Sequence, residues 1–323
     1  MEYRVLGTTG IKVSALCFGT MSFGGDADKE TSRGMFNRCL EAGINFFDTA
    51  DVYNQGVAEE WLGEFMRDCR DQIVVATKVW GRTGSAINDA GLSRRHIMQA
   101  VKASLRRMNT DRIDIYYLHN FDPDTPMEET LRALDDLQRQ GKILYPAVSN
   151  WAAWQIAKAL GLADLKGWNR FACIQPMYNL AKRQAEVEIL PLAAAENLGI
   201  VTYSPLGGGL LTGKYTSNQK PAHGRLVENQ MYVKRYGQDV YYEIAERFAA
   251  YAREHDIHPV SLAVAWVMSH PHVTAPIIGA RNLEQLEPSL AAAEIKMTPE
   301  WRVEISKLSP TPPPATDRSE DQQ

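Results

Sequence analysis

A single barrel of eight parallel strands with helices between them is the fold that the sequence predicts. Eight short apolar runs of strand-like length recur along the chain after a small N-terminal hairpin. Most segments between these runs carry apolar residues at helical spacing. Alternating strands and helices are typical of parallel β/α units, and eight such units close a (β/α)8, or TIM, barrel. The 323 residues fit this α/β fold as one domain.

The first predicted element is a β-hairpin, in which residues 3–6 and 11–13 flank a turn between Gly7 and Gly10. We expect this hairpin to cap one end of the barrel. Proline has no N–H for a strand ladder, so Pro146 is expected at or before the start of the fifth barrel strand. The eight barrel strands are predicted at residues 15–19, 44–47, 73–77, 113–118, 147–149, 172–175, 200–203 and 275–278.

Helices are predicted between the strands. Ser93 is the expected N-cap of a helix that ends at Met108 and has its apolar residues on one face. Further helices are predicted at residues 127–140, 151–160 and 185–197.

Three segments interrupt the regular alternation. Long loops at residues 21–29 and 207–239 follow the first and seventh strands, where barrel enzymes place the loops of their pockets, at the C-terminal face. The barrel is expected to span residues 1–309. The tail 310–323 is polar and contains a proline run, so we expect it to be disordered.

The composition argues against a nucleic-acid or membrane partner. Basic residues number 35 and acidic residues 39, for a net charge of -4, and no basic cluster provides an electrostatic footprint. Neither a signal peptide nor a membrane-spanning stretch is predicted, so we expect a cytoplasmic protein. The four cysteines are scattered and the histidines of residues 255–272 lack accompanying carboxylates, so neither a disulfide framework nor a metal site is expected.

Four polar side chains stand just past the ends of neighbouring predicted strands. Asp48 and Tyr53 follow the second strand, Lys78 follows the third and His119 follows the fourth. Taken singly, each residue has an ordinary structural role in a loop, at the surface or in a core. Because the carboxyl ends of barrel strands meet at one end, however, we expect the four side chains to converge.

Their chemistry suits proton donation to a carbonyl oxygen. A phenol has an ordinary pKa of about 10, and a nearby ammonium group lowers it, so we expect Lys78 to lower the pKa of Tyr53. Asp48 is expected to hold the lysine charged and oriented. His119 suits either orientation of the substrate oxygen or a proton relay. Since protonation alone yields no stable product, an electron source is needed, and hydride from a nicotinamide meets that need.

Several segments around these residues resemble the aldo-keto reductase family. The sequence FFDTADVY at 46–53, with EWLG at 60–63, resembles the principal signature of the family. ATK at 76–78 and YLH at 117–119 resemble the lysine and histidine segments of the family. VSN at 148–150 and IQPMYN at 174–179 resemble two of its cofactor segments. The resemblance implies a β/α barrel that binds NADPH without a Rossmann domain. In agreement, no Gly-x-Gly-x-x-Gly follows an early strand.

The resemblance also implies the cofactor contacts. Tyr203 would stack under the nicotinamide ring, and Ser149, Asn150 and Gln175 would bind its carboxamide. The glycine-rich segment 207–213 suits phosphate on physical grounds too, because backbone amides after the seventh barrel strand often bind it. The full set expected to bind the cofactor is Gly19, Thr20, Met21, Asp48, Ser149, Asn150, Gln175, Tyr203, Ser204, Pro205, Leu206, Gly208, Leu210, Lys214, Gly279, Arg281 and Gln285.

The family places the adenosine 2′-phosphate after the last barrel strand, where Arg281 lies. A guanidinium group meets phosphate with paired donors, and Gln285 would join the adenosine contacts. The chain departs from the family pattern at Pro288 and Ser289, so the expected preference for NADPH rests mainly on Arg281.

The sequence thus predicts an NADP-dependent oxidoreductase that reduces an aldehyde or ketone to an alcohol. Tyr53 would be the general acid, and Trp80, Tyr53 and His119 would line the substrate pocket. Two other classes stay open: a cofactor-binding regulatory subunit with weak or no turnover, similar to channel-associated members of the family, and a metal-dependent hydrolase. The particular substrate, the direction of reaction, the strictness for NADPH, the role of the loop at 207–239 and the oligomeric state are not predicted.

Overall fold

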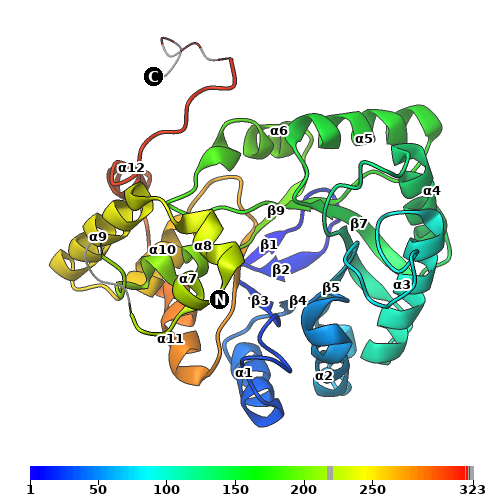
Figure 1. The fold of residues 1–323 in the computed structure, drawn as a ribbon, viewed down its shortest axis with the longest axis horizontal. Helices are drawn as coiled ribbons and strands as arrows, with labels where there is room; N and C mark the ends of the chain where they lie inside the picture. The colour runs from blue at the N-terminus through cyan, green and yellow to red at the C-terminus, as the bar shows by residue number, and fades with distance from the viewer. Residues whose placement is uncertain (217–220, 317, 319, 321–323) are drawn as a thin grey trace.

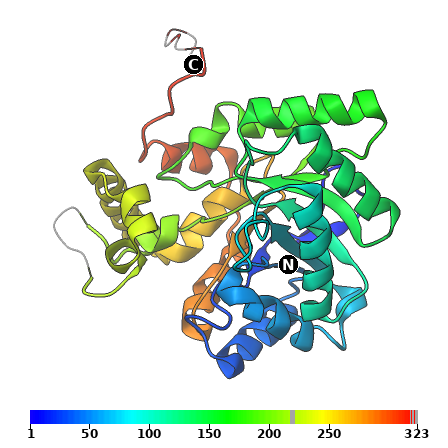
Figure 2. The ribbon, with the colours of Figure 1, turned by 45° about the vertical axis from the view of Figure 1, so that its right-hand side comes forward.

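The computed structural model describes residues 1–216, 221–316, 318 and 320, and shows a closed barrel surrounded by helices (Figure 1 and Figure 2). The predicted (β/α)8 fold is therefore confirmed. Around the barrel the strand order is β10-β3-β4-β5-β6-β7-β8-β9, with every neighbouring pair parallel. The strands are β3 (Cys17–Gly19), β4 (Phe46–Asp48), β5 (Val74–Val79), β6 (Ile113–Leu118), β7 (Ile143–Ser149), β8 (Cys173–Gln175), β9 (Gly199–Thr202) and β10 (Ala275–Ile278).

The N-terminal hairpin covers the amino ends of the barrel strands, as predicted. It is made by β1 (Tyr3–Val5) and β2 (Lys12–Ser14), which pair antiparallel. Leu6 and Val13 are fully buried and pack with the inward-facing side chains of the barrel. A Cβ atom on Gly7 would lie 2.6 Å from the Gly199 backbone nitrogen, so the hairpin turn sits directly against the start of β9.

The helices form the outer layer, and apolar side chains fill the space between them and the strands. Ser93 caps its helix as predicted, because its side chain accepts a hydrogen bond from the His96 amide (3.3 Å). The α-helices outside the long loop are α1 (Lys29–Glu41), α2 (Val57–Phe65), α3 (Arg94–Met108), α4 (Met127–Arg139), α5 (Ala153–Lys166), α6 (Ile189–Ala195), α9 (Asp239–Glu254), α10 (Pro259–Met268), α11 (Leu283–Ala291) and α12 (Pro299–Ser306).

Shorter helical turns lie mostly in the loops. The long loop after β9 contains η4 (Gly207–Thr212), α7 (Arg225–Glu228) and α8 (Gln230–Tyr236). The other short turns are η1 (Tyr53–Gly56), η2 (Arg70–Gln72), η3 (Gln184–Glu186) and η5 (Ala292–Glu294).

Strand β7 departs from the prediction. It begins at Ile143, so Pro146 lies inside the strand, opposite Tyr116 of β6. The prediction for Pro146 was wrong because it assumed that both neighbours of the strand extend this far. On the β8 side the pairing starts only at Ala147 and Cys173, where a missing N–H at Pro146 breaks no ladder bond.

The alternation along β5 decides which of its side chains point into the barrel and which point toward the helices. Ala76 belongs to the cluster inside the barrel, whereas Val75 and Val79 pack in the outer layer. Since strand side chains alternate, Lys78 points inward and Thr77 points outward, toward the helices.

The chain after α12 leaves the barrel without further regular elements over residues 310–316 (Figure 1). Residues 317, 319 and 321–323 lie outside the described residues, and the disorder expected of the tail stays a prediction. In the described part of the chain, no helix combines the length and the apolar character needed to cross a membrane.

Two helical glycines provide a test of the packing. A Cβ atom on Gly63 of α2 would lie 2.5 Å from the Met108 carbonyl oxygen, whereas one on Gly161 of α5 would meet nothing within 4 Å. Gly63→Ala is expected to lower the free energy of unfolding by about 1–3 kcal/mol through overpacking. Gly161→Ala is expected to raise it by about 0.5–1 kcal/mol. Urea unfolding followed by circular dichroism measures both, and equal effects of the two substitutions would contradict the close approach of α2 and α3.

Candidate active site

The centre of the candidate site is the side chain of Lys78, which is fully buried at the carboxyl end of β5. Its ammonium group forms an ion pair with the Asp48 carboxylate and donates a hydrogen bond to the Thr49 carbonyl oxygen (2.6 Å). It also donates to the Tyr53 hydroxyl (3.4 Å). The other Asp48 oxygen accepts a hydrogen bond from the Gln175 amide (2.8 Å). Lys78 thereby joins β4, β5 and the turn that carries Tyr53.

Tyr53 lies in a tight turn whose backbone conformation is unusual. The next two residues, Asn54 and Gln55, have φ values of 47° and 57°, in the left-handed region that non-glycine residues seldom occupy. The Asn54 side-chain amide donates hydrogen bonds to the carbonyl oxygens of Met21 (3.0 Å) and Phe23 (2.6 Å). Such strain persists where the surroundings hold the residue in place, and here the loop after β3 does so.

The pKa values of this network follow from its burial and its charges. Burial raises the pKa of Tyr53 above its ordinary value, and the opposing effect of Lys78 does not cancel this rise. Lys78 acts in the expected direction, since its charge and its hydrogen bond lower the pKa of Tyr53, but the loss of solvent is the larger effect and the net shift is upward. Burial likewise raises the pKa of Asp48. For Lys78, burial favours the neutral form, but Asp48 and Tyr53 outweigh it and the pKa is raised.

His119 stands beside Tyr53, with their ring centroids 6.0 Å apart and the rings nearly perpendicular. Burial, together with the positive charge of Lys78, lowers the pKa of His119 to about 3. The imidazole is therefore neutral near pH 7, where it can donate one hydrogen bond and accept another. This state suits orientation of a substrate oxygen better than donation of a proton.

The residues expected to bind a nicotinamide lie along the carboxyl ends of the next strands. The Tyr203 hydroxyl donates to the Asn150 side-chain oxygen (2.7 Å), and the Asn150 amide donates to the His119 carbonyl oxygen (2.9 Å). The Ser149 hydroxyl donates to the Gln175 carbonyl oxygen (2.9 Å). These side chains form one connected wall next to Lys78, so the structure brings this part of the predicted set together.

The predicted residues of β3 and the β10 loop lie close to one another. Gly19 packs against β10, where a Cβ atom would lie 2.7 Å from the Ile277 side chain. Thr20 is buried and donates to the Asp48 carbonyl oxygen, whereas Met21 is exposed. In the loop after β10, the Gln285 side chain accepts a hydrogen bond from the Arg281 amide (3.3 Å). Gly279 approaches the Gly19 carbonyl oxygen, since a Cβ atom there would lie 3.5 Å from it.

The glycine-rich turn η4 begins at Gly207, directly after Ser204, Pro205 and Leu206. Leu206 closes it by accepting hydrogen bonds from two amides of the turn, and Gly207, Gly208 and Gly209 have φ between 60° and 102°. A Cβ atom on Gly208 would lie 2.5 Å from the Tyr232 ring, which packs over the turn. The Leu210 side chain is fully buried in the core, so only its backbone is free to meet a ligand.

A cluster of positive charge lies beside this turn. Burial lowers the pKa of Lys214, and the guanidinium groups of Arg281 and Arg225 lower it further. Asp26, from the loop after β3, forms ion pairs with Arg281 (3.0 Å) and Arg225 (3.5 Å). Asp26 pairs with two of these three cations, and Lys214 has the two guanidinium groups as charged neighbours, which is a favourable setting for a bound anion.

The loop with α7 and α8 closes over this region of the barrel end. A hollow of about 400 Å³ remains between it and the loop after β3, lined by Met21, Gly25, Asp26, Asn54, Arg225, Glu228, Asn229, Tyr232 and Arg281. The sequence did not decide what Arg225 and Tyr232 contact, and Asp26 was not predicted as a residue of this region. The available signal for Asp26 was an acidic residue in the glycine turn after the first barrel strand.

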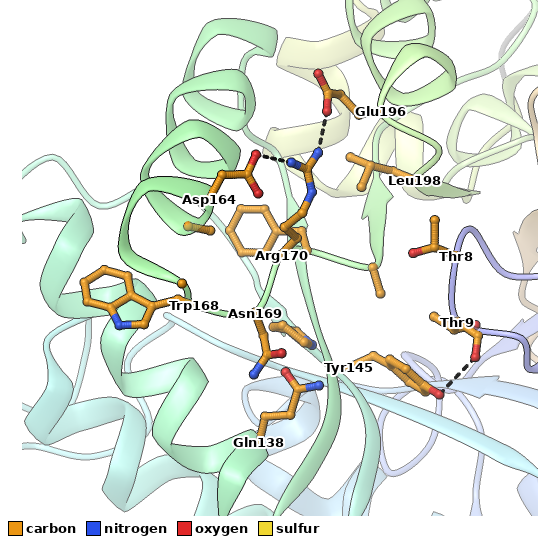
Figure 3. A pocket seen from close by; sticks show the side chains of 15 residues that line it. Thr8, Thr9, Gln138, Tyr145, Asp164, Trp168, Asn169, Arg170, Glu196 and Leu198 are labelled. Carbon is orange, nitrogen blue, oxygen red and sulfur yellow. Dashed lines mark hydrogen bonds and ion pairs between the residues drawn. The ribbon is translucent and has the colours of Figure 1, made fainter.

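A second hollow, of about 560 Å³, lies on the side of the barrel where the N-terminal hairpin packs, and Figure 3 shows the side chains that line it. Its lining comes from the hairpin turn, the middle of β7, the segments that precede β8 and β9, and the ends of α4 and α5. The Arg170 guanidinium group forms ion pairs there with Asp164 and Glu196. None of the predicted catalytic or cofactor residues lines this second hollow.

Comparison with known proteins shows the family of this chain. The family model for the aldo/keto reductase family matches residues 15–309. The chain belongs to the aldo/keto reductase family. It is 36% identical to an uncharacterized oxidoreductase, YrpG, of Bacillus subtilis, over 97% of each chain. It is 37% identical to a probable voltage-gated potassium channel subunit beta of Arabidopsis thaliana, over 91% of this chain and 92% of that protein. It is 31% identical to the versiconal hemiacetal acetate reductase of Aspergillus parasiticus, over 93% and 94%.

The buried ion pair can be tested by a double-mutant cycle. Asp48→Asn and Lys78→Met each leave one buried charge without its partner, and each is expected to lower the free energy of unfolding by about 3–5 kcal/mol. The double variant removes both charges and is expected to lose less than the sum of the two. Urea unfolding of the four proteins measures this coupling. Additive losses would show that Lys78 and Asp48 do not depend on each other.

Proposed function

We propose that this aldo/keto reductase family member reduces an aldehyde or ketone to the alcohol with NADPH, and that Tyr53 is the general acid. The observation that carries the proposal is the phenol of Tyr53 placed 3.4 Å from a fully buried ammonium group. A phenol with a raised pKa holds its proton at neutral pH, and an adjacent cation stabilises the phenolate that forms when the proton leaves.

NADPH, when bound, supplies a hydride to the carbonyl carbon. Tyr53 gives its proton to the carbonyl oxygen as the alcohol forms, and Lys78 stabilises the remaining phenolate. Asp48 keeps Lys78 charged through their ion pair. The neutral imidazole of His119 orients the carbonyl oxygen by a hydrogen bond, and Trp80, at the end of β5, lines the substrate pocket. Oxidation of the alcohol uses the same groups in reverse.

The positive charge beside the η4 turn supports the fit of an NADP cofactor. Lys214 lies near the guanidinium groups of Arg225 and Arg281, which pair with Asp26, so a phosphate group would relieve the repulsion among the three cations. We assign the 2′-phosphate to Arg281 and the nicotinamide to Ser149, Asn150, Gln175 and Tyr203. Ser204, Pro205, Leu206 and the turn η4 would meet the phosphates, with Gly19, Thr20, Met21, Gly279 and Gln285 completing the site. The cytoplasmic location expected from the sequence stays a prediction.

A second candidate is a cofactor-binding subunit that acts on a partner. The names of relatives in Arabidopsis thaliana and Oryza sativa, which are probable voltage-gated potassium channel beta subunits, favour keeping it. Tight NADPH binding without turnover of any carbonyl compound, together with isolation of a stable partner complex, would favour this alternative over the reductase.

Tyr53→Phe tests the acid directly. Removal of the hydroxyl is expected to lower kcat about 10²- to 10⁴-fold, since this is the usual contribution of a positioned general acid. The dissociation constant of NADPH is expected to stay within about threefold, because the ring remains. NADPH absorbance with a panel of carbonyl compounds gives kcat, and protein fluorescence gives cofactor binding. Wild-type turnover by the variant would refute the assignment of Tyr53.

Arg281→Ala tests the phosphate assignment. Loss of a charge-assisted pair costs about 1.5–3 kcal/mol, so NADPH affinity is expected to fall about tenfold to a hundredfold. NADH has no 2′-phosphate, and its affinity is expected to change by less than about threefold. Lys296→Ala, at an exposed position of the same C-terminal region, is a control. Equal losses for the two cofactors would contradict recognition of the 2′-phosphate by Arg281.

A further inference from the structure

Asp51 has a buried carboxyl group that the proposed mechanism does not use. It lies between Asp48 and Tyr53 in sequence and is only 2% exposed. Neither of its carboxyl oxygens has a hydrogen bond of normal geometry to a described residue, although the Val52 amide is close enough to oppose a rise in its pKa. A buried carboxylate without donors is costly, so this group requires an explanation.

A second buried carboxyl group takes the donors near Asp51. Glu59 of α2 is fully buried and accepts hydrogen bonds from the Thr77 hydroxyl (2.6 Å) and the Arg107 guanidinium group of α3 (2.6 Å). The buried hydroxyl of Tyr116, on β6, has no hydrogen-bond partner in the described chain. Two buried carboxyl groups therefore lie within the influence of one guanidinium group, which is bonded to Glu59 alone.

This arrangement favours the uncharged form of Asp51. The charged and titratable groups around it are Glu59 of α2, Arg107 of α3, Lys78 of β5 and Tyr116 of β6. Burial, and then the negative charge of Glu59, raise the pKa of Asp51 to about 8, against the opposing charges of Arg107 and Lys78. Both oxygens of Glu59 are bonded to Thr77 and Arg107, so these donors are not available to a charged Asp51.

The same cluster contacts the turn that presents Tyr53. The Asp51 amide donates to the Lys78 carbonyl oxygen (3.4 Å), and the Tyr53 amide donates to Ala50 (3.1 Å). At the other end of the turn, a Cβ atom on Gly56 would lie 2.7 Å from the Arg107 side chain. A shift of Asp51 or Arg107 would therefore move the backbone on both sides of Tyr53.

We propose that Asp51 is a positioning residue, whose uncharged carboxyl group fills the space beside the Glu59–Arg107 ion pair and holds the turn of Tyr53 in its active conformation. The effect on turnover rests on the proposed reductase function. When Asp51 ionises, a second anion faces Glu59 without a donor, and the turn must move to admit water or a cation. The phenol then loses its placement beside Lys78.

The pH profile of kcat tests this role. Wild-type kcat is expected to fall above pH 8, about tenfold by pH 9, because one unit above its pKa only about a tenth of Asp51 is uncharged. Asp51→Asn has an uncharged side chain of the same shape and is expected to retain most of kcat at pH 7 and to extend the plateau beyond pH 9. Asp51→Ala is expected to lower kcat at every pH, with NADPH affinity within about threefold.

The control is Glu60→Gln, at an exposed position next to Glu59 on α2, and it is expected to leave the wild-type profile unchanged. An equal fall above pH 8 in wild type and Asp51→Asn would overturn the proposal. So would a wild-type kcat that stays constant between pH 7 and pH 9.

Thermal unfolding gives a readout that needs no turnover. The pKa of Asp51 is near 3.9 in the unfolded chain and about 8 in the folded protein. Between these values only the unfolded chain loses the Asp51 proton, and this loss favours unfolding increasingly as pH rises. The Tm of Asp51→Asn relative to wild type is expected to rise from pH 5 to pH 8 and to level off above. A difference in Tm that stays constant with pH would overturn the claim that Asp51 is uncharged, even if the protein reduces no carbonyl compound. A rising difference without any change in the kcat profile would overturn the positioning role.

Discussion

The ammonium group of Lys78 is the charge on which the arrangement of this site depends. Transfer of such a group from water into a protein interior costs several kcal/mol unless it is paired and hydrogen bonded. Here its donors meet Asp48, the Thr49 carbonyl and the Tyr53 hydroxyl, which come from one strand end and the turn after it. The parallel register of β4 and β5 makes this possible, because it places Asp48 beside Ala76 and leaves Lys78 two residues further toward the active end.

The charges around this centre divide the barrel end into two regions. Near Lys78, burial keeps Tyr53 and His119 uncharged, which suits exchange of a proton with an uncharged substrate. Beyond the η4 turn, Lys214, Arg225 and Arg281 form a group of three cations, two of them paired with Asp26, which suits an anionic group. The wall of hydrogen-bonded side chains at the ends of β7 to β9 connects the two regions. A ligand with an uncharged reactive ring and a phosphorylated tail matches this distribution of charge.

Most of the barrel was predictable because its strands are short apolar runs and its helices carry a clear apolar face. The placement of Asp48, Tyr53, Lys78 and His119 at one end followed from strand polarity alone. Pro146 was misplaced because the prediction ignored where β8 begins. The correctly predicted strands, helices and strand ends depend on local sequence patterns, whereas the error at Pro146 concerns the pairing of β7 with a neighbouring strand.

The remaining parts of the site depend on long-range contacts that a sequence does not display. The net shift of the Tyr53 pKa required the extent of its burial, which outweighs the nearby cation. The ion pairs of Asp26 join the loop after β3 to α7 and to the loop after β10, about 200 and 255 residues away. Asp51 and Glu59 come together because the turn after β4 packs against Arg107 of α3. The sequence around Asp51 does not display this contact.

The most direct test of the central claim is the protonation state of Tyr53 itself. Carbon-13 NMR of protein labelled at the tyrosine Cζ, with the Tyr53 signal assigned by its loss in Tyr53→Phe, follows the phenol as pH rises. Because burial holds its pKa above the ordinary value despite Lys78, the signal is expected to remain that of a neutral phenol through about pH 9. A phenolate signal from Tyr53 at neutral pH would contradict this account.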